Sequence, residues 1–270
     1  MPENQKRVFF GFEALAPWPD KLPSGRMLDS HQRHMTVAFL GNIRYPDLEN
    51  VREELPKPNF TLGFTGYFNE SLQLPPRHPN VVAWHVKFEP KTMAALHLFH
   101  EQLTSVLKSV QLLPEKEDRK LLPHVTLCRF PFDSKQWQKQ FTPLPVIFTR
   151  FNLYESTGQL HYTTLWTHDL IPPFEEISHT ADIAFIIRGN DVSEIYTHAL
   201  TALAFKHPSL TKYLGDETQI TNLDAIIVKL NEVIALADEE SGCSFKAISY
   251  HGELTQDQKG IFNWEMIVDV

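Results

Sequence analysis

Short segments rich in β-branched and aromatic residues, separated by polar links, make up most of the first 170 residues. Such segments favour strands, because branched and aromatic side chains pack well on a pleated surface. The expected strands are residues 6–12, 34–41, 59–68, 80–88, 124–130 and 159–166. Between Lys91 and Val110 the apolar residues instead recur at helical spacing, which predicts an amphipathic helix. A second helix is expected within residues 131–141, so this part of the chain is predicted to be α+β.

Pro172 and Pro173 interrupt the chain where this pattern ends. Adjacent prolines punctuate a sequence, because each one fixes φ and lacks a backbone donor. Beyond them we expect strands at residues 180–189, 244–254 and 262–270, helices at residues 192–205 and 228–237, and either a strand or the start of a helix at residues 218–222. The sequence therefore predicts two α+β domains, residues 1–170 and residues 171–270.

The composition is that of a globular protein, with 42% hydrophobic and 21% charged residues among 270. A formal net charge of -8 argues against broad, non-specific binding to nucleic acid, although a small pocket can still hold one terminal phosphate. No apolar run approaches the roughly 20 residues of a membrane helix, and the first residues lack a signal-peptide core. The two cysteines have no metal-type spacing, so we expect a cytoplasmic protein with no membrane partner.

Histidine is the side chain that exchanges protons near neutral pH, and the chain has 13 of them. Two of them begin matching His-x-Thr segments, at His34 and His124. On a strand, alternate side chains share a face, so each segment presents an imidazole and a hydroxyl together. Two such strands facing each other would form a pocket with two proton-transfer groups, and Thr36 and Thr126 would be its phosphate-binding hydroxyls.

This set of side chains suits the opening of a cyclic phosphate. One imidazole accepts a proton from water while the other gives a proton to the departing sugar oxygen. The threonine hydroxyls and the backbone hold the phosphoryl oxygens as negative charge builds on them. We expect no cofactor in this step, because the phosphate ring is strained and its leaving group is protonated directly.

A His-x-Thr tripeptide is a weak signal by itself, since about one is expected by accident in a chain with this many histidines. A third, His161-Tyr162-Thr163, is set aside because the residue after it breaks the apolar alternation of its strand. The competing interpretation is that His34 and His124 are surface or hydrogen-bonded strand residues. His31 either approaches the pocket or stays in solvent, and Arg129 either binds a phosphate or caps its strand.

The segments flanking the two histidines resemble the 2H phosphoesterase family, most closely its RNA 2′,3′-cyclic phosphodiesterases, once described as 2′–5′ RNA ligases. The resemblance covers about residues 6–170 and rests on Phe39-Leu40-Gly41, Pro123, Arg129, His161-Tyr162-Thr163 and residues 7–10, 80–84 and 153–156. It implies two similar lobes of antiparallel strands and helices around a cleft, with His34 as proton donor and His124 as proton acceptor. The family has a longer helical segment where this chain has the proline-containing residues 16–33.

From Phe174 onwards the chain resembles archease, the small protein that assists the GTP-dependent RNA-splicing ligase. The matching residues are 179–184, 246–251 and 268–270. The resemblance implies a metal bound by Asp182, Asp269 and Val270, and an all-oxygen site of this kind suits Ca²⁺ or Mg²⁺. From the residues alone, the alternative interpretation is that Asp182 caps a strand end and that Asp269 is solvated. Archeases have additional strand residues before the segment that matches residues 246–251, and this chain lacks them. The resemblance is therefore to a shortened archease.

The sequence therefore predicts an enzyme that hydrolyses RNA 2′,3′-cyclic phosphate ends to 2′-phosphate ends, with tRNA among the candidate substrates. The archease-like part would couple it to RNA ligation or tRNA splicing, with the GTP-dependent RNA-splicing ligase as partner. The rival prediction is a non-enzymatic adaptor that binds RNA ends and recruits or activates that ligase. A related enzyme alternative is a 2H esterase for 2′–5′ oligonucleotides or cyclic ADP-ribose products.

Overall fold

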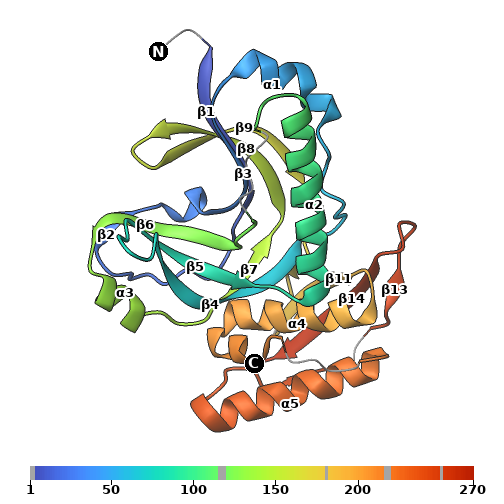
Figure 1. Ribbon diagram of the computed structural model, residues 1–270. Coiled ribbons are helices and arrows are strands. Elements are labelled where there is room, and N and C mark those ends of the chain that lie inside the picture. Colours follow the sequence, from blue (N-terminus) through green and yellow to red (C-terminus); the bar gives the residue numbers. More distant parts are fainter. Residues whose placement is uncertain (1–3, 115–119, 180–181, 216–219, 250–251) are drawn as a thin grey trace.

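The computed structural model describes residues 4–114, 120–179, 182–215, 220–249 and 252–270. These residues form two antiparallel sheets, one of nine strands within residues 5–169 and one of five strands within residues 174–269 (Figure 1). Helices pack on both sheets, so the described part of the chain is α+β.

The larger sheet has the strand order β7-β4-β5-β6-β3-β1-β8-β9, and β2 pairs with β6 beside this path. Its strands are β1 (Gln5–Glu13), β2 (Gly25–Met27), β3 (His34–Arg44), β4 (Phe64–Leu74), β5 (Val81–Lys87), β6 (His124–Phe132), β7 (Pro145–Phe148), β8 (Arg150–Gly158) and β9 (His161–Asp169). The α-helices of this unit are α1 (Tyr45–Val51), α2 (Pro90–Ser109) and α3 (Ser134–Lys139), and short 3₁₀ turns lie at Ser30–Gln32 and Arg52–Glu54.

Strands β3 and β6 join the two halves of this sheet. They pair in the antiparallel sense through Met35 and Val125, and neither side chain is exposed. Both side chains belong to the hydrophobic core, which also takes in the buried face of α2. Apolar packing in the core, together with the strand pairing itself, therefore stabilises the junction between the two halves.

Helix α2 is amphipathic, as its sequence period predicts. It buries Leu96, Phe99, Leu103 and Leu107. The ring of Phe99 lies 5.1 Å from that of Phe151 on β8, centroid to centroid. The apolar face of α2 therefore packs against one face of the larger sheet.

The smaller sheet has the order β10-β11-β14-β12, with β13 paired to β14. Its strands are β10 (Phe174–Ile177), β11 (Ile183–Gly189), β12 (Ala247–Ile248), β13 (Thr255–Gln256) and β14 (Phe262–Asp269). It is packed against α4 (Val192–Lys206), α5 (Leu223–Ser241) and a 3₁₀ helix at Pro208–Tyr213. Asp191 and Asn222 cap the two α-helices through backbone amides of their first turns. No helix within the described ranges is long and apolar enough to cross a membrane.

Several expected elements differ from those observed. The strand expected at residues 59–68 begins only at Phe64. Residues 244–254 contain only the two-residue strand β12, which pairs with the last residues of β14, and residues 250–251 lie outside the described residues. Near residue 220 the chain enters a helix, because Asn222 caps α5, while residues 218–219 also lie outside the description. The short elements β2, β7, β10 and α1 have too few residues for a periodic pattern to predict.

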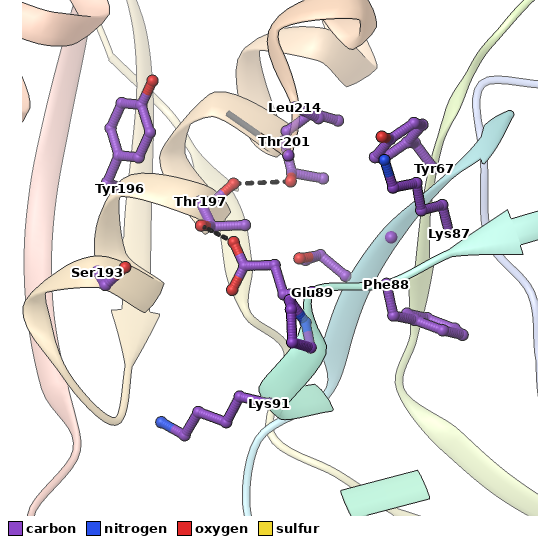
Figure 2. A pocket seen from close by; sticks show the side chains of 14 residues that line it. Tyr67, Lys87, Phe88, Glu89, Lys91, Ser193, Tyr196, Thr197, Thr201 and Leu214 are labelled. Carbon is purple, nitrogen blue, oxygen red and sulfur yellow. Dashed lines mark hydrogen bonds between the residues drawn. The ribbon is translucent and has the colours of Figure 1, made fainter. Parts of the chain in front are cut away.

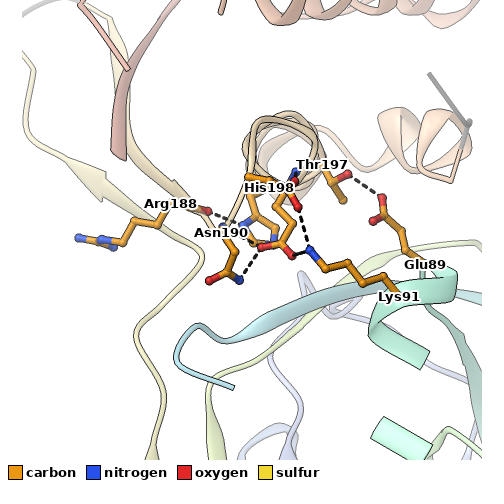
Figure 3. A network of polar contacts seen from close by, with 8 residues as sticks. Glu89, Lys91, Arg188, Asn190, Thr197 and His198 are labelled. Carbon is orange, nitrogen blue, oxygen red and sulfur yellow. Dashed lines mark hydrogen bonds and ion pairs between the residues drawn. The ribbon is translucent and has the colours of Figure 1, made fainter. Parts of the chain in front are cut away.

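A polar network connects the start of α2 with the start of α4 (Figure 3). Lys91 Nζ lies 2.8 Å from Asp191 Oδ2 and 2.9 Å from Glu194 Oε1. The hydroxyl of Thr197 donates to Glu89 Oε1 at 2.6 Å. These contacts tie the two sheets' helices together across residues a hundred positions apart. The predicted domain boundary at residue 170 falls between β9 and β10 and stays a prediction.

Replacing Met35 by Ala should lower the free energy of unfolding by about 2–4 kcal/mol, because it removes a fully buried side chain and leaves a cavity beneath the β3–β6 junction. Urea denaturation measures this change. The control is Leu98→Ala on α2, whose side chain is 51% exposed and whose loss should change stability by less than about 0.5 kcal/mol. Equal losses in both variants would contradict the importance of the junction.

Candidate active site

The pairing of Met35 with Val125 fixes which side chains share the opposite face of the sheet. Continuing the register of this antiparallel pair by one residue on either side of the matched couple sets His34 across from Thr126 and Thr36 across from His124. Met35 and Val125 point into the core, so these four side chains point to the opposite face of the sheet. The structure therefore brings both predicted histidines and both predicted threonines together on one face.

The two imidazoles are oriented in the same way. Each histidine is the first residue of its strand, and each Nδ1 lies 2.7 Å from the carbonyl oxygen two residues earlier, at Gln32 for His34 and at Leu122 for His124. A carbonyl oxygen can only accept, so Nδ1–H must donate in both rings. The proton-free nitrogen is then Nε2 in each ring, which is the atom available to exchange a proton.

His34 lies within an aromatic wall. Only 7% of the residue is exposed, and its ring centroid lies 4.7 Å from that of Phe9, 5.1 Å from Tyr154 and 4.9 Å from Tyr162. Among the described residues, Nε2 of His34 has no hydrogen-bond partner. This atom nevertheless keeps some solvent-accessible surface. The wall thus restrains the ring while Nε2 remains accessible.

Burial makes both imidazoles harder to protonate. It lowers the pKa of His34 from 6.5 to about 4; the hydrogen bond to Gln32 opposes this shift, and the nearby charges of His124 and Arg129 add to it. Burial also lowers the pKa of His124, against the hydrogen bond to Leu122. The effect of His124 on the pKa of His34 indicates that the two imidazoles lie close enough to interact. In the free protein at neutral pH both rings are accordingly neutral.

A bulge in each strand brings a further side chain to the same face. Ala83 and Val82 of β5 pair with Thr126 and Cys128, so Leu127 is the extra residue of β6 and the alternation changes phase. Arg129 consequently lies on the face of Thr126, where strict alternation would have turned it away. Its Nε is buried without a hydrogen-bond partner among the described residues, which favours a phosphate-binding role over strand capping.

The corresponding bulge in β3 acts on Phe39. Phe10 and Gly11 of β1 pair with Ala38 and Thr36, so Val37 is the extra residue. Phe39 then shares the face of Thr36, across from Phe9, and the two rings stack at 6.2 Å. The two histidine strands therefore carry the same local geometry, with an aromatic residue in one and a cation in the other at the fifth position after the histidine.

A third imidazole lies beside the pair. His85 of β5 is directly across from His124, and its Nδ1 lies 2.7 Å from Asn69 Oδ1. Burial lowers the pKa of His85; Glu70 opposes this shift and His124 adds to it. Sequence reasoning assigned no role to His85, because only the strand order shows that β5 and β6 are neighbours.

The structure places the two other histidines considered from the sequence, His161 and His31, outside the histidine pair. His161 begins β9 and is exposed, whereas the next residue, Tyr162, contributes the ring against His34. His31 lies in the 3₁₀ turn before β3 and lines a cavity of about 380 Å³ together with Arg150 and Tyr162. His31 therefore lies at the edge of the His34 surroundings and not in the histidine pair itself.

Another cavity lies on the His124 side of the site. It has a volume of about 390 Å³, and Thr36, Phe39, Lys120 and His124 are among the residues that line it. A larger cavity, about 610 Å³, lies elsewhere, between the larger sheet and α4, and is lined by side chains such as Tyr67, Lys87 and Thr201 (Figure 2). Neither histidine of the pair contributes to this larger cavity.

The predicted metal ligands lie at the end of the smaller sheet. Ile183 pairs with Val268, so the adjacent Asp182 and Asp269 occupy neighbouring positions. Asp269 accepts a hydrogen bond from Ser249, and Lys246 donates to the carbonyl oxygen of Val270 at 2.6 Å. Within the described ranges no group of three His, Cys, Asp or Glu side chains is placed to hold a metal ion. A Ca²⁺ or Mg²⁺ site at Asp182, Asp269 and Val270 stays a prediction.

No family model and no curated protein matches the chain. Part of it is similar to solved structures. Escherichia coli LigT complexed with 3′-AMP is 22% identical, covers 62% of this chain and 98% of its own, and has a TM-score of 0.46. A crystal structure described as a phosphoesterase is also 22% identical, over 62% and 98% of the two chains, with a TM-score of 0.43.

The protein TT0787 of Thermus thermophilus is 19% identical over 61% of this chain and 97% of its own, with a TM-score of 0.39. With TM-scores below 0.5, these likenesses carry no functional inference. The archease resemblance of the second part gains no support from these comparisons.

We predict that His34 and His124 share one neutral tautomer, with the proton on Nδ1, because each Nδ1 faces a carbonyl oxygen. The ¹⁵N chemical shifts of uniformly labelled protein at pH 7.5 distinguish protonated from unprotonated ring nitrogens. Signals are assigned by their disappearance in His34→Gln and His124→Gln. A proton on Nε2 in either ring would contradict the proposed orientation of that ring.

Proposed function

We propose that the protein hydrolyses 2′,3′-cyclic phosphate ends of RNA to 2′-phosphate ends. The observation that carries this proposal is the shared face of His34 and His124, each with Nδ1 bound to a backbone carbonyl, which leaves Nε2 as the nitrogen that exchanges a proton. Two proton-transfer groups beside hydroxyl and guanidinium donors match the needs of phosphodiester hydrolysis. A non-enzymatic adaptor would need no such matched pair of ring orientations.

The reaction follows from these positions. Nε2 of His124 accepts a proton from water as the water oxygen forms a bond to phosphorus. The bond between phosphorus and O3′ breaks, and O3′ takes the proton that His34 carries on Nε2. Thr36, Thr126 and Arg129 hold the non-bridging oxygens. The product has a 2′-phosphate and a free 3′-hydroxyl, and the two histidines have exchanged their protonation states.

The donor role of His34 requires a bound anion. Burial is the largest cause that lowers its pKa to about 4, so the free protein holds this ring neutral at pH 7. A phosphate beside it favours the imidazolium form, because opposite charges attract strongly where water is excluded. Substrate binding would then supply the charge that stabilises the proton on His34.

We expect His34→Ala and His124→Ala each to lower kcat by about 10²–10⁴-fold, since each removes one proton-transfer group. Hydrolysis of a nucleoside 2′,3′-cyclic phosphate, followed by chromatography, measures the loss. His161→Ala is the matched control, because it changes the exposed histidine of the third His-x-Thr segment. Full activity in either of the first two variants, with their folds intact, would favour the adaptor.

The pH dependence should be bell-shaped, because one imidazole must be protonated and the other neutral. Both pKa values are lowered from 6.5 in the free protein, so each ring loses its proton at a lower pH than usual. The optimum of kcat/KM should therefore lie below pH 6.5, whereas the optimum of kcat should lie at a higher pH because bound phosphate raises both values. A kcat/KM optimum above pH 7.5 would contradict this assignment.

The archease-like role of the second part stays a separate prediction. What supports it is the adjacency of Asp182 and Asp269 at the end of the smaller sheet. Its test is the binding of purified protein to the GTP-dependent RNA-splicing ligase, with and without Ca²⁺ or Mg²⁺, compared with Asp269→Asn. Hydrolysis without ligase binding would separate the enzyme from its predicted partner.

A further inference from the structure

Two arginines lie across from each other at one end of the histidine face. Arg26 of β2 pairs with Arg129 of β6. Strand β6 pairs with β3 near its start, at Val125, and with β2 nearer its end. Matched residues of an antiparallel pair project to the same side. Arg26 therefore shares the face that carries Arg129, His34 and Thr126.

Like charges directly across two strands destabilise a sheet unless an anion lies between them. Neither guanidinium forms an ion pair with a residue in the described part of the chain. The Nε of Arg129 is, in addition, buried without a partner. These are the features of a built anion site, since buried donors in folded proteins normally have an acceptor.

The histidine face has a direction. Strand β3 runs from His34 to Thr36 and on to Phe39, so the aromatic end lies beyond the row of Thr36 and His124. Strand β6 runs the opposite way, so Arg129 lies beyond the row of His34 and Thr126, at the other end. One end of the face thus offers the ring of Phe39 and the cavity it lines, and the other end offers two guanidinium groups.

We propose that Arg26, which lies beside Arg129, binds the phosphodiester on the 5′ side of the terminal ribose, so that the preferred substrate is an oligonucleotide and not a mononucleotide. This inference rests on the proposed function. A phosphodiester is a monoanion with two free oxygens, and both can accept from the fork of one guanidinium group.

The chemistry of the terminal nucleotide fits this direction. In ribose the base is attached next to the carbon that bears O2′, and the 5′ chain is attached next to the carbon that bears O3′. His34, the donor to O3′, lies on the side of the arginine pair. The 5′ phosphodiester then extends toward Arg26 and Arg129, and the base extends toward Phe39 and the 390 Å³ cavity.

The test compares a nucleoside 2′,3′-cyclic phosphate with a dinucleotide that ends in a 2′,3′-cyclic phosphate. Wild-type protein should prefer the dinucleotide in kcat/KM by about 10- to 100-fold, the usual effect of charge-assisted hydrogen bonds. Arg26→Gln should remove this preference and leave mononucleotide hydrolysis within about twofold of wild type. It should also reduce the slope of log kcat/KM against log salt concentration by about 0.7, as for one lost phosphate contact on a single strand.

Two further variants make the result decisive. Lys120→Ala changes the cation at the aromatic end, and Arg44→Ala changes an exposed arginine at the far end of β3. Loss of the dinucleotide preference in Lys120→Ala but not in Arg26→Gln would overturn the proposal, as would equal losses on both substrates in Arg26→Gln. If wild-type protein hydrolyses both substrates without preference, only the role of Arg26 fails. If it hydrolyses neither, the proposed function fails as well.

Discussion

The pairing of one buried methionine with one buried valine is the constraint on which the candidate site depends. Met35 and Val125 join the two halves of the larger sheet and carry no exposed surface. Because side chains alternate along a strand, packing these two residues inward turns the residues on either side of each outward. The apolar core thus determines the arrangement of the polar face, and the two histidines meet because the residues next to them are buried.

Similar backbone geometry gives the two histidines different surroundings. Both strands begin with the histidine, hold its Nδ1 through a carbonyl two residues earlier, and contain a bulge three residues after it. Yet His34 lies among the rings of Phe9, Tyr154 and Tyr162, whereas His124 has another imidazole, His85, as its neighbour. Different environments around two like groups are what separates an acid from a base in a paired mechanism.

The elements that follow a regular period could be predicted from the sequence, including the histidine strands and α2, because such patterns are local. Arg129 shows the limit of this reasoning: alternation turns it away from His124, and the bulge that returns it to the same face has no clear signal in the sequence. His85 and Tyr162 could not be assigned either, since they reach the site through strand order. The brief pairing of β12 likewise depends on where β14 ends, which residues 244–254 do not encode.

The measurement that tests the central claim most directly is the fate of a cyclic-phosphate-terminated RNA incubated with the protein in water enriched in ¹⁸O. Paired-imidazole hydrolysis predicts a single product that carries a 2′-phosphate with one ¹⁸O atom, because one water molecule attacks phosphorus and only O3′ is protonated. Mass spectrometry and resolution of the two phosphate isomers read both features. Recovery of unlabelled cyclic phosphate, or of a 3′-phosphate product, would contradict the roles assigned to the two histidines.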